Sequence, residues 1–222
     1  MADFYSGDGW LAARVLFMIP VVLSLTVHEF AHAWTARRLG DDTAEREGRL
    51  TLNPLEHIDP VGLLLPLLGV PFGWAKPVPI NPGKFSHSVR METGLILTAG
   101  AGPLSNLAIA LATTLGMAAW THADPGARAS GAWAMLEMLV VLNLVLAIFN
   151  MLPVHPLDGS RIADGLMPRD WRPAWNRFAG LGYAPLIAVL VVPLFFGVSV
   201  LEGPLDHLQH FLDQLFLLLA AR

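Results

Sequence analysis

The sequence predicts an all-α polytopic membrane protein, with about four to six transmembrane helices and a small extended or β re-entrant region on the cytoplasmic side. Composition is the first reason: hydrophobic residues make up 54% of the 222 residues and charged residues only 14%, against about 25% charged in soluble domains. The mean hydropathy of +0.53 agrees with this. Apolar segments long enough to cross about 30 Å of hydrocarbon recur along the chain, so lipid is the expected solvent.

The first apolar segment covers residues 10–39 and is expected to be a membrane anchor. Residues 1–9 lack the basic n-region and the cleavage site of a secretory signal, so the segment is expected to stay in the mature protein. As a helix it would be about 45 Å long, enough to cross the hydrocarbon and project beyond it. Arg37 and Arg38, followed by Gly40, predict the end of this helix.

Further apolar segments long enough to span the bilayer cover residues 92–120, 132–152 and 178–201. Residues 61–75 differ, because Gly and Pro interrupt them and they fall short of the roughly 17–25 residues of a spanning helix. We expect this segment to be re-entrant. Apolar and polar residues recur with helical spacing over 205–219, which predicts an amphipathic helix at the membrane interface or packed on the bundle.

Residues 74–80 are expected to form an extended run, since prolines recur at every second position within it. Pro77 and Pro79 cannot donate from one edge of this run, because proline has no backbone N–H. Lys76, Val78 and Ile80 keep their N–H groups on the other edge. That edge is expected to be free to pair with an extended substrate, and a docking role for Val78 is a hypothesis of the sequence.

Lys and Arg gather on one side of the membrane if the re-entrant segment does not cross it. Loops 37–57, 73–90 and 150–177 then share that side and carry four, three and four of these residues. Arg14 and Arg128 lie on the opposite side. The positive-inside rule associates such an excess with the cytoplasmic face, so the three loops are expected in the cytoplasm.

The overall charge and the cysteine count exclude two kinds of function. A net charge of −4 and a pI near 6.0 provide no basic surface for DNA or RNA, so no nucleic-acid partner is expected. Without cysteine the chain has neither a disulfide framework nor a Cys-ligated metal. Any metal ligand has to come from His, Asp or Glu.

Residues 28–32 read His28-Glu29-Phe30-Ala31-His32, late in the first apolar helix. On a helix, positions i and i+4 share a face, so both imidazoles can bind one metal while Glu29 lies beside them. This is the H-E-x-x-H arrangement of zinc peptidases. The alternative is a pair of core histidines with a snorkelling glutamate. Three ionisable groups within five residues of a membrane helix are costly, which favours the metal site.

Two histidines leave a catalytic zinc one protein ligand short. Residues 150–161 end a spanning segment, and their two prolines must unwind the helix there; unwound backbone at membrane depth is tolerated where it lines a cavity. Asp158 in this turn is a candidate ligand, although Asp is also a favoured N-cap for the helix that follows. His57 and His155 are the rival candidates.

Several different short motifs lie at intervals along the chain. They are the H-E-x-x-H motif, Leu39-Gly40-Asp41, the run from Gly48 to Pro54, the run from Gly73 to Pro79, the run from Ala101 to Asn106, and the Asn-x-x-Pro-x-x-Pro-Leu-Asp-Gly run from Asn150. Together they resemble the site-2 protease family of intramembrane zinc metalloproteases. The resemblance covers residues 10 to about 165, and residues 170–222 are less typical. Nothing matches the PDZ or CBS modules of many relatives, so residues 1–222 are expected to form a single membrane-embedded metalloprotease domain.

The resemblance implies roles for individual residues. His28, His32 and Asp158 would hold one zinc ion, and Glu29 would act as the general base. Asn150 would lie near the scissile bond.

Asn106 is a further candidate for lining the site and contacting substrate, and Gly102 for lining the site. Close helix packing is an alternative at least as good for both.

The activity implied is hydrolysis of peptide bonds in or near transmembrane segments of membrane proteins. The partners would be a transmembrane protein or peptide and the lipid bilayer, and the location a bacterial cytoplasmic membrane, with the active site toward the cytoplasm. Two other functions use the same residues: a transmembrane metal transporter, and an inactive protein that binds membrane helices. Glu29 discriminates between them, since a transporter needs metal ligands but no base beside them.

Overall fold

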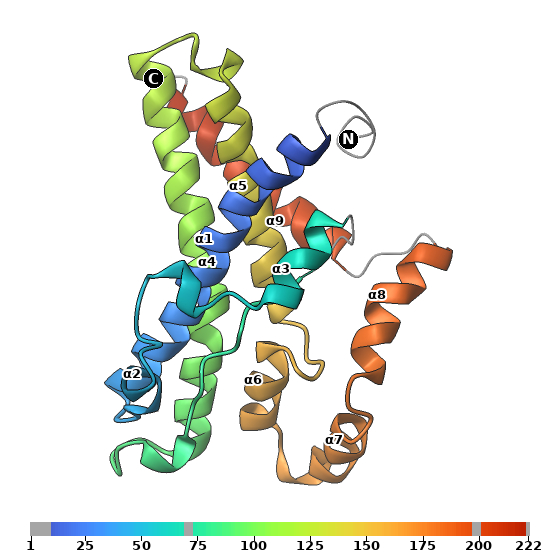
Figure 1. Cartoon of the computed structure of the whole chain (residues 1–222). Coiled ribbons are helices and arrows are strands. Elements are labelled where there is room, and N and C mark those ends of the chain that lie inside the picture. Colours follow the sequence, from blue (N-terminus) through green and yellow to red (C-terminus); the bar gives the residue numbers. More distant parts are fainter. Residues whose placement is uncertain (1–9, 69–72, 197–200, 221–222) are drawn as a thin grey trace.

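The structure, a computed structural model, describes residues 10–68, 73–196 and 201–220 (Figure 1). Its helices are α1 (Trp10–Arg38), α2 (Thr43–Arg46), α3 (Pro60–Leu67), α4 (Met91–Ala123), α5 (Gly131–Asn150), α6 (Asp158–Leu166), α7 (Arg172–Ala179), α8 (Ala184–Phe196) and α9 (Glu202–Ala220). The predicted all-α class is confirmed over this part of the chain. Residues 69–72 of the expected re-entrant segment and residues 197–200 of the last expected span lie outside the described residues.

Three of the described helices, α1, α4 and α5, are long and apolar enough to cross a membrane. The segment Arg169–Ala179 and the segment Ala184–Val192 pass the same test together, but they are bent by 72° where they meet. The described chain therefore has three candidate spans, or four if the bent pair forms one span. This makes it a multi-pass membrane protein, but the expected count of four to six spans is not confirmed, because three of these candidates pass the test singly and the fourth depends on the bent pair.

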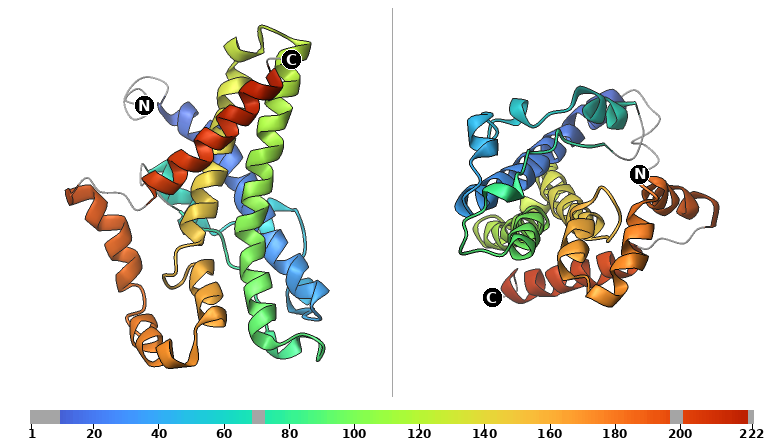
Figure 2. Two further views of the ribbon diagram at one scale, coloured as in Figure 1. Left: turned by 180° about the vertical axis from the view of Figure 1, so that it is seen from behind. Right: turned by 90° about the horizontal axis from the view of Figure 1, so that it is seen from below.

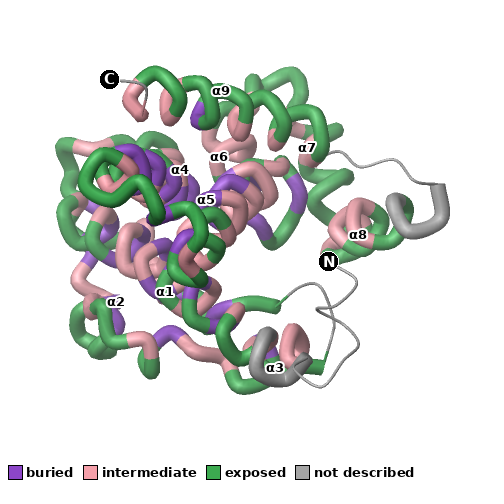
Figure 3. The backbone as a smooth tube through the Cα atoms, turned by 90° about the horizontal axis from the view of Figure 1, so that it is seen from above, coloured by how far each residue is buried: buried purple, intermediate pink, exposed green. Residues whose placement is uncertain are grey.

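Helix α4 lies at the centre of the bundle, where α1, α5, α6 and α9 pack against it (Figures 1 and 2). Its buried residues include several small ones: Gly94, Ala99, Gly102 and Ala110. Small residues let helix backbones approach closely, which is how helices associate in a membrane. The buried positions gather between α1, α4 and α5 (Figure 3). Helix α4 is therefore placed to contact side chains from several neighbours at one point.

Helix α9 packs along the bundle through its apolar face. Leu212 is buried in a core cluster with residues of α4 and α5, and the neighbouring apolar residues of α9 lie against the same cluster, among them Leu205, Leu208 and Phe216. The predicted amphipathic helix is thus confirmed in its bundle-packed form. It is not among the helices of the described chain that pass the test for a spanning helix.

The expected β region is reduced to one isolated antiparallel bridge, between Ile58 and Ala75, and the described residues contain no strand. Beside the bridge, the Lys76 N–H donates to the His57 carbonyl at 2.8 Å. Prolines directly after Lys76 remove the donors that a longer ladder needs, so the pairing stops there. In the sequence, helix α3 lies between Ile58 and Ala75, so the bridge joins the two ends of the segment that contains α3.

The basic loops gather at one end of the bundle. Figure 1 shows α2, α6 and α7 at the lower end, and the connection between α4 and α5 at the upper end. Buried Asp41, which follows α1, accepts hydrogen bonds from the backbone N–H groups of Thr43 at 3.0 Å and Asn81 at 2.6 Å. Lys84 pairs with Asp42 at 3.0 Å, and its hydrogen bond lowers the pKa of the Asp42 carboxyl. These contacts tie the extended segment to the end of α1.

Candidate metal centre and active site

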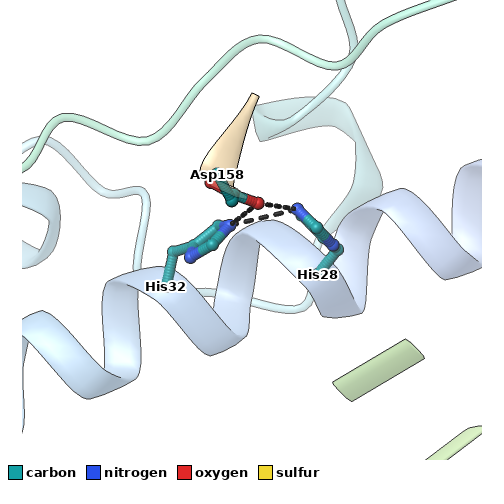
Figure 4. A group of neighbouring side chains, drawn as sticks. All are labelled: His28, His32 and Asp158. Carbon is teal, nitrogen blue, oxygen red and sulfur yellow. Dashed lines mark hydrogen bonds and ion pairs between the residues drawn. The ribbon is translucent and has the colours of Figure 1, made fainter. Parts of the chain in front are cut away.

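His28 and His32 lie one turn apart on α1, as the motif spacing predicts. Their Nε2 atoms are 3.0 Å apart, and each lies 3.1 Å from Oδ2 of Asp158. Figure 4 shows the carboxylate of Asp158 facing both rings. Within the described part of the chain, these are the residues that form a group of three His, Asp or Glu ligand atoms within 4.8 Å of one another.

Asp158 reaches the histidines because the helix breaks after Asn150 and restarts at α6. Helix α6 begins at Asp158 with Leu157 in the cap position and no side-chain capping bond, so the capping alternative is not what the carboxylate does. Gly159 makes the turn possible, since a Cβ there would lie 2.2 Å from the Met151 carbonyl oxygen. The turn therefore packs against the end of α5 and directs Asp158 toward α1.

The three side chains have the burial and charge that a zinc site needs. The His28 and Asp158 side chains are only 5% and 13% exposed, and that of His32 is 6% exposed. The Asp158 carboxylate supplies a negative charge, and both Nε2 atoms point toward it. Ligand atoms about 2.0–2.1 Å from a tetrahedral zinc lie about 3.3 Å apart, close to the spacing found here. The three residues therefore fit a Zn²⁺ ion.

The other nitrogen of each ring is held by helix α4. His28 Nδ1 lies 2.6 Å from Oδ1 of Asn106, and His32 Nδ1 lies 2.7 Å from the Thr98 carbonyl oxygen. Carbonyl oxygens only accept, so both Nδ1 atoms donate and each Nε2 keeps its lone pair. Metal-binding histidines are typically oriented in this way by a second hydrogen bond.

Glu29 is half-buried and lies beside His28 on α1. Its Oε2 accepts a hydrogen bond from the Val78 N–H at 2.8 Å, so the extended segment lies against the helix that carries the motif. The Val78 side chain is itself buried, with 6% exposure. A carboxylate next to the proposed metal position is suited to accept a proton there.

The expectation of a free edge over residues 74–80 is wrong for Lys76 and Val78. The Lys76 N–H is bonded to the His57 carbonyl and the Val78 N–H to Glu29. Both donors are satisfied within the chain because the extended segment folds back on α1 and on the loop that contains His57. A substrate can pair with Val78 only by replacing its contact with Glu29.

Asn106 lies behind His28, and the two rival histidines lie outside the group of three ligand atoms. Asn106 is fully buried behind His28, so it faces the ligand and not a surface that a substrate reaches. His57 is buried with its Nε2 2.8 Å from the Thr51 carbonyl oxygen, away from the cluster. His155 is exposed, and its ring lies 5.8 Å from that of Tyr183.

Asn150 lies at the end of α5, where its amide donates to the Leu146 carbonyl at 3.0 Å. The residue is partly exposed. Its side chain therefore bonds within its own helix, and its proposed place near the scissile bond stays a prediction.

Thr98, whose carbonyl oxygen contacts His32, is not among the residues predicted from the sequence, and Gly102 is predicted only as lining the site or packing. Thr98, Gly102 and Asn106 recur at four-residue intervals on α4, and all three are buried. Such spacing places them on one helix face. The combination of a hydroxyl residue, a glycine and an amide on one face of a spanning helix was the available signal.

Gly102 packs directly against both imidazoles, and replacing it by alanine is expected to abolish zinc binding. A Cβ there would lie 2.4 Å from His32 Nε2 and 2.6 Å from His28 Nε2, inside van der Waals contact with the proposed ligand atoms. The zinc content of purified Gly102→Ala protein, measured by mass spectrometry, tests this. Gly100→Ala is the matched control, since a Cβ at Gly100 meets nothing within 4 Å. Normal zinc content in Gly102→Ala would contradict the assigned site.

Comparisons with known proteins agree with this geometry. The sequence profile of Peptidase family M50 matches residues 115–193, which include the Asp158 turn. YwhC of Bacillus subtilis, whose name describes a zinc metalloprotease, is 39% identical over 187 residues, covering 83% of this chain and 84% of the relative. Rip2 of Mycobacterium tuberculosis, similarly named, is 36% identical over 200 residues, covering 85% and 73%. Rip2 of Mycolicibacterium smegmatis is 29% identical over 200 residues, covering 86% and 73%.

No solved structure gives a significant match to the chain. The relationship to YwhC extends over most of both proteins. The expected resemblance is confirmed: the chain belongs to Peptidase family M50, the site-2 protease family of intramembrane zinc metalloproteases.

Proposed function

We propose that this zinc metalloprotease hydrolyses peptide bonds in or near transmembrane segments, with His28, His32 and Asp158 as ligands of one zinc ion. Glu29 is proposed as the general base. The observation that carries the proposal is the meeting of three ligand atoms, within 3.1 Å of one another, beside a carboxylate on the same helix. Neither a metal path nor a helix-binding surface requires that carboxylate.

The proposed ligands and base divide the chemistry between them. A bound zinc lowers the pKa of a coordinated water toward about 7 and polarises the scissile carbonyl. Glu29 accepts the proton of the attacking water and passes it to the leaving nitrogen. Asn106 and Thr98 keep the two imidazoles fixed during this transfer, through the hydrogen bonds to their Nδ1 atoms.

The substrate of this proposal is a membrane-embedded segment that has been locally unwound. A peptide bond inside a helix is shielded and its backbone groups are paired, so an extended stretch has to form before cleavage. Asn150, at the partly exposed end of α5, is proposed to contact this stretch. Val78 is proposed to pair with it after its N–H leaves Glu29.

We further propose that the site faces the cytoplasm of a bacterial cytoplasmic membrane. Support comes from the basic loops, which gather at the end of the bundle where α6 and α7 lie. A cavity of about 420 Å³ lies beside the turn with Asp158 and is lined in part by His155, Ser160 and Arg161. Such a cavity supports access for water from this end.

The whole chain is proposed to act as one membrane-embedded domain, with a catalytic core over residues 10–165. Residues 61–75 are proposed to enter the membrane without crossing it. The bent pair of α7 and α8 is proposed as the fourth span. The packing of α6 and α9 on α4 supports a single unit, because no described helix of the core is independent of α4 or its neighbours.

Metal analysis combined with cleavage of a membrane substrate tests the proposed function. We expect about one zinc per purified chain, cleavage of a model protein with a single transmembrane segment, loss of cleavage after chelation, and its return on addition of Zn²⁺. Cleavage that persists after complete metal removal would overturn the proposal. Zinc transport into proteoliposomes without any cleavage would favour the transporter.

A further inference from the structure

A line of four buried polar side chains runs from the proposed ligand His28 across the bundle. Behind His28, Asn106 on α4 donates from Nδ2 to Oδ1 of Asn143 on α5, at 2.8 Å. Asn143 in turn donates from Nδ2 to Oγ of Ser24 on α1, at 2.8 Å. With the His28–Asn106 contact, the line begins and ends on α1 and joins three spanning helices.

Burying these polar side chains costs free energy unless each donor and acceptor has a hydrogen-bond partner. Asn106 and Asn143 are fully buried, and Ser24 is 1% exposed. An amide left unpaired in an apolar environment is strongly destabilising, whereas an apolar residue of similar size would fill the same space without that cost. Polar residues inside spanning helices are accordingly associated with function.

The hydrogen bonds of the line have a fixed direction that is set at Asn143. Its Nδ2 also donates to the Leu139 carbonyl at 2.8 Å, and a backbone carbonyl can only accept. The amide nitrogen of Asn143 therefore faces Leu139 and Ser24, and its oxygen faces Asn106. This places the amide nitrogen of Asn106 toward Asn143 and the oxygen of Asn106 toward His28.

We propose that Asn143 is a positioning residue for the metal centre, acting through Asn106. By fixing the amide of Asn106, Asn143 forces His28 to donate from Nδ1 and leaves the lone pair of Nε2 for zinc. Without Asn143, the amide of Asn106 can turn over and present its NH₂ group to His28, which favours the wrong tautomer. The inference rests on the proposed function, because it takes His28 as a zinc ligand.

A double-mutant cycle on zinc affinity separates this role from general packing. Asn143→Leu is expected to weaken zinc binding by the apoprotein about 10- to 100-fold, the range for residues that orient a metal ligand. The carboxylate of Asn106→Asp has two equivalent acceptor oxygens. Turning it over therefore does not change what it presents to His28. In the Asn106→Asp background, Asn143→Leu is therefore expected to change zinc affinity by less than about threefold.

Zinc affinity would be measured by competition with a chromophoric chelator, and the visible absorption of bound Co²⁺ would report the ligand geometry. Thr114→Val, which removes a buried hydroxyl of α4 bonded to the Ala110 carbonyl, is the matched control and is expected to leave both unchanged. If Asn143→Leu fails to fold, Asn143→Ala replaces it with the same expectation. No loss at Asn143, or an equal loss in both backgrounds, would overturn the inference. Failure of the unmodified protein to bind zinc would overturn the proposed function as well.

Discussion

Glu29→Gln is expected to bind zinc normally and to lose proteolysis. Glutamine keeps the shape of the side chain and a carbonyl oxygen that can accept the hydrogen bond from the Val78 N–H, so the packing of the extended segment is expected to survive. It cannot take a proton at neutral pH. General-base catalysis is worth about 10²- to 10⁴-fold, so kcat/KM should fall by that factor or more. Cleavage of a membrane substrate and zinc content, measured on the same preparation, test both halves.

Glu137→Gln is the matched control for this experiment. Glu137 is also a glutamate of a spanning helix, but its Oε1 accepts from the Trp133 indole N–H at 2.7 Å, within α5. It lies near the start of α5, whereas Asp158 follows the end of that helix. Glu137→Gln is expected to keep full proteolytic activity. Activity of Glu29→Gln equal to that of the control would exclude Glu29 as the base.

Asp158→Ala is expected to lose zinc and activity together. Removing the carboxylate leaves two imidazoles as protein ligands, one fewer than catalytic zinc sites usually have. Loss of a residue that only orients a ligand costs about 10- to 100-fold in metal affinity, and loss of a ligand is expected to cost more. Zinc affinity of the apoprotein, measured against a chelator of known strength, gives the size of the effect.

The control for Asp158→Ala is Asp170→Ala, which removes an exposed carboxylate from the turn that precedes α7. Zinc affinity and cleavage are expected to match those of the unmodified protein. A comparable loss in both variants would mean that Asp158 acts through the stability of the α6–α7 region and not as a ligand. Zinc retained in Glu29→Gln but lost in Asp158→Ala would distinguish loss of the general base from loss of the metal ion.

The local part of the site could be predicted from the sequence, and the distant part could not. His28, Glu29 and His32 share one helix, so the 3.6-residue period alone places the two imidazoles together. Asp158 lies 126 positions after His32, and no spacing rule connects them. Its approach depends on a broken helix and on the packing of α6 against α4. The assignment of Asp158 therefore required the family resemblance.

For the extended region, the sequence predicted the backbone conformation but not its hydrogen-bond partners. Alternating prolines correctly indicated that residues 74–80 do not form a helix, and the structure has none there. The pattern could not show what the remaining N–H groups bond to, because their partners, His57 and Glu29, come from other parts of the chain. Helix periodicity is a local property, whereas the pairing of an edge is a tertiary one.

The distance along the chain between the proposed ligands has a consequence for synthesis. Helix α1 leaves the ribosome first, with both histidines and the glutamate, while the aspartate follows 126 residues behind His32. A nascent chain that has delivered only its first helices to the membrane has an incomplete zinc site. With the ligands proposed above, hydrolytic activity requires the chain as far as Asp158, which follows the third candidate span, α5.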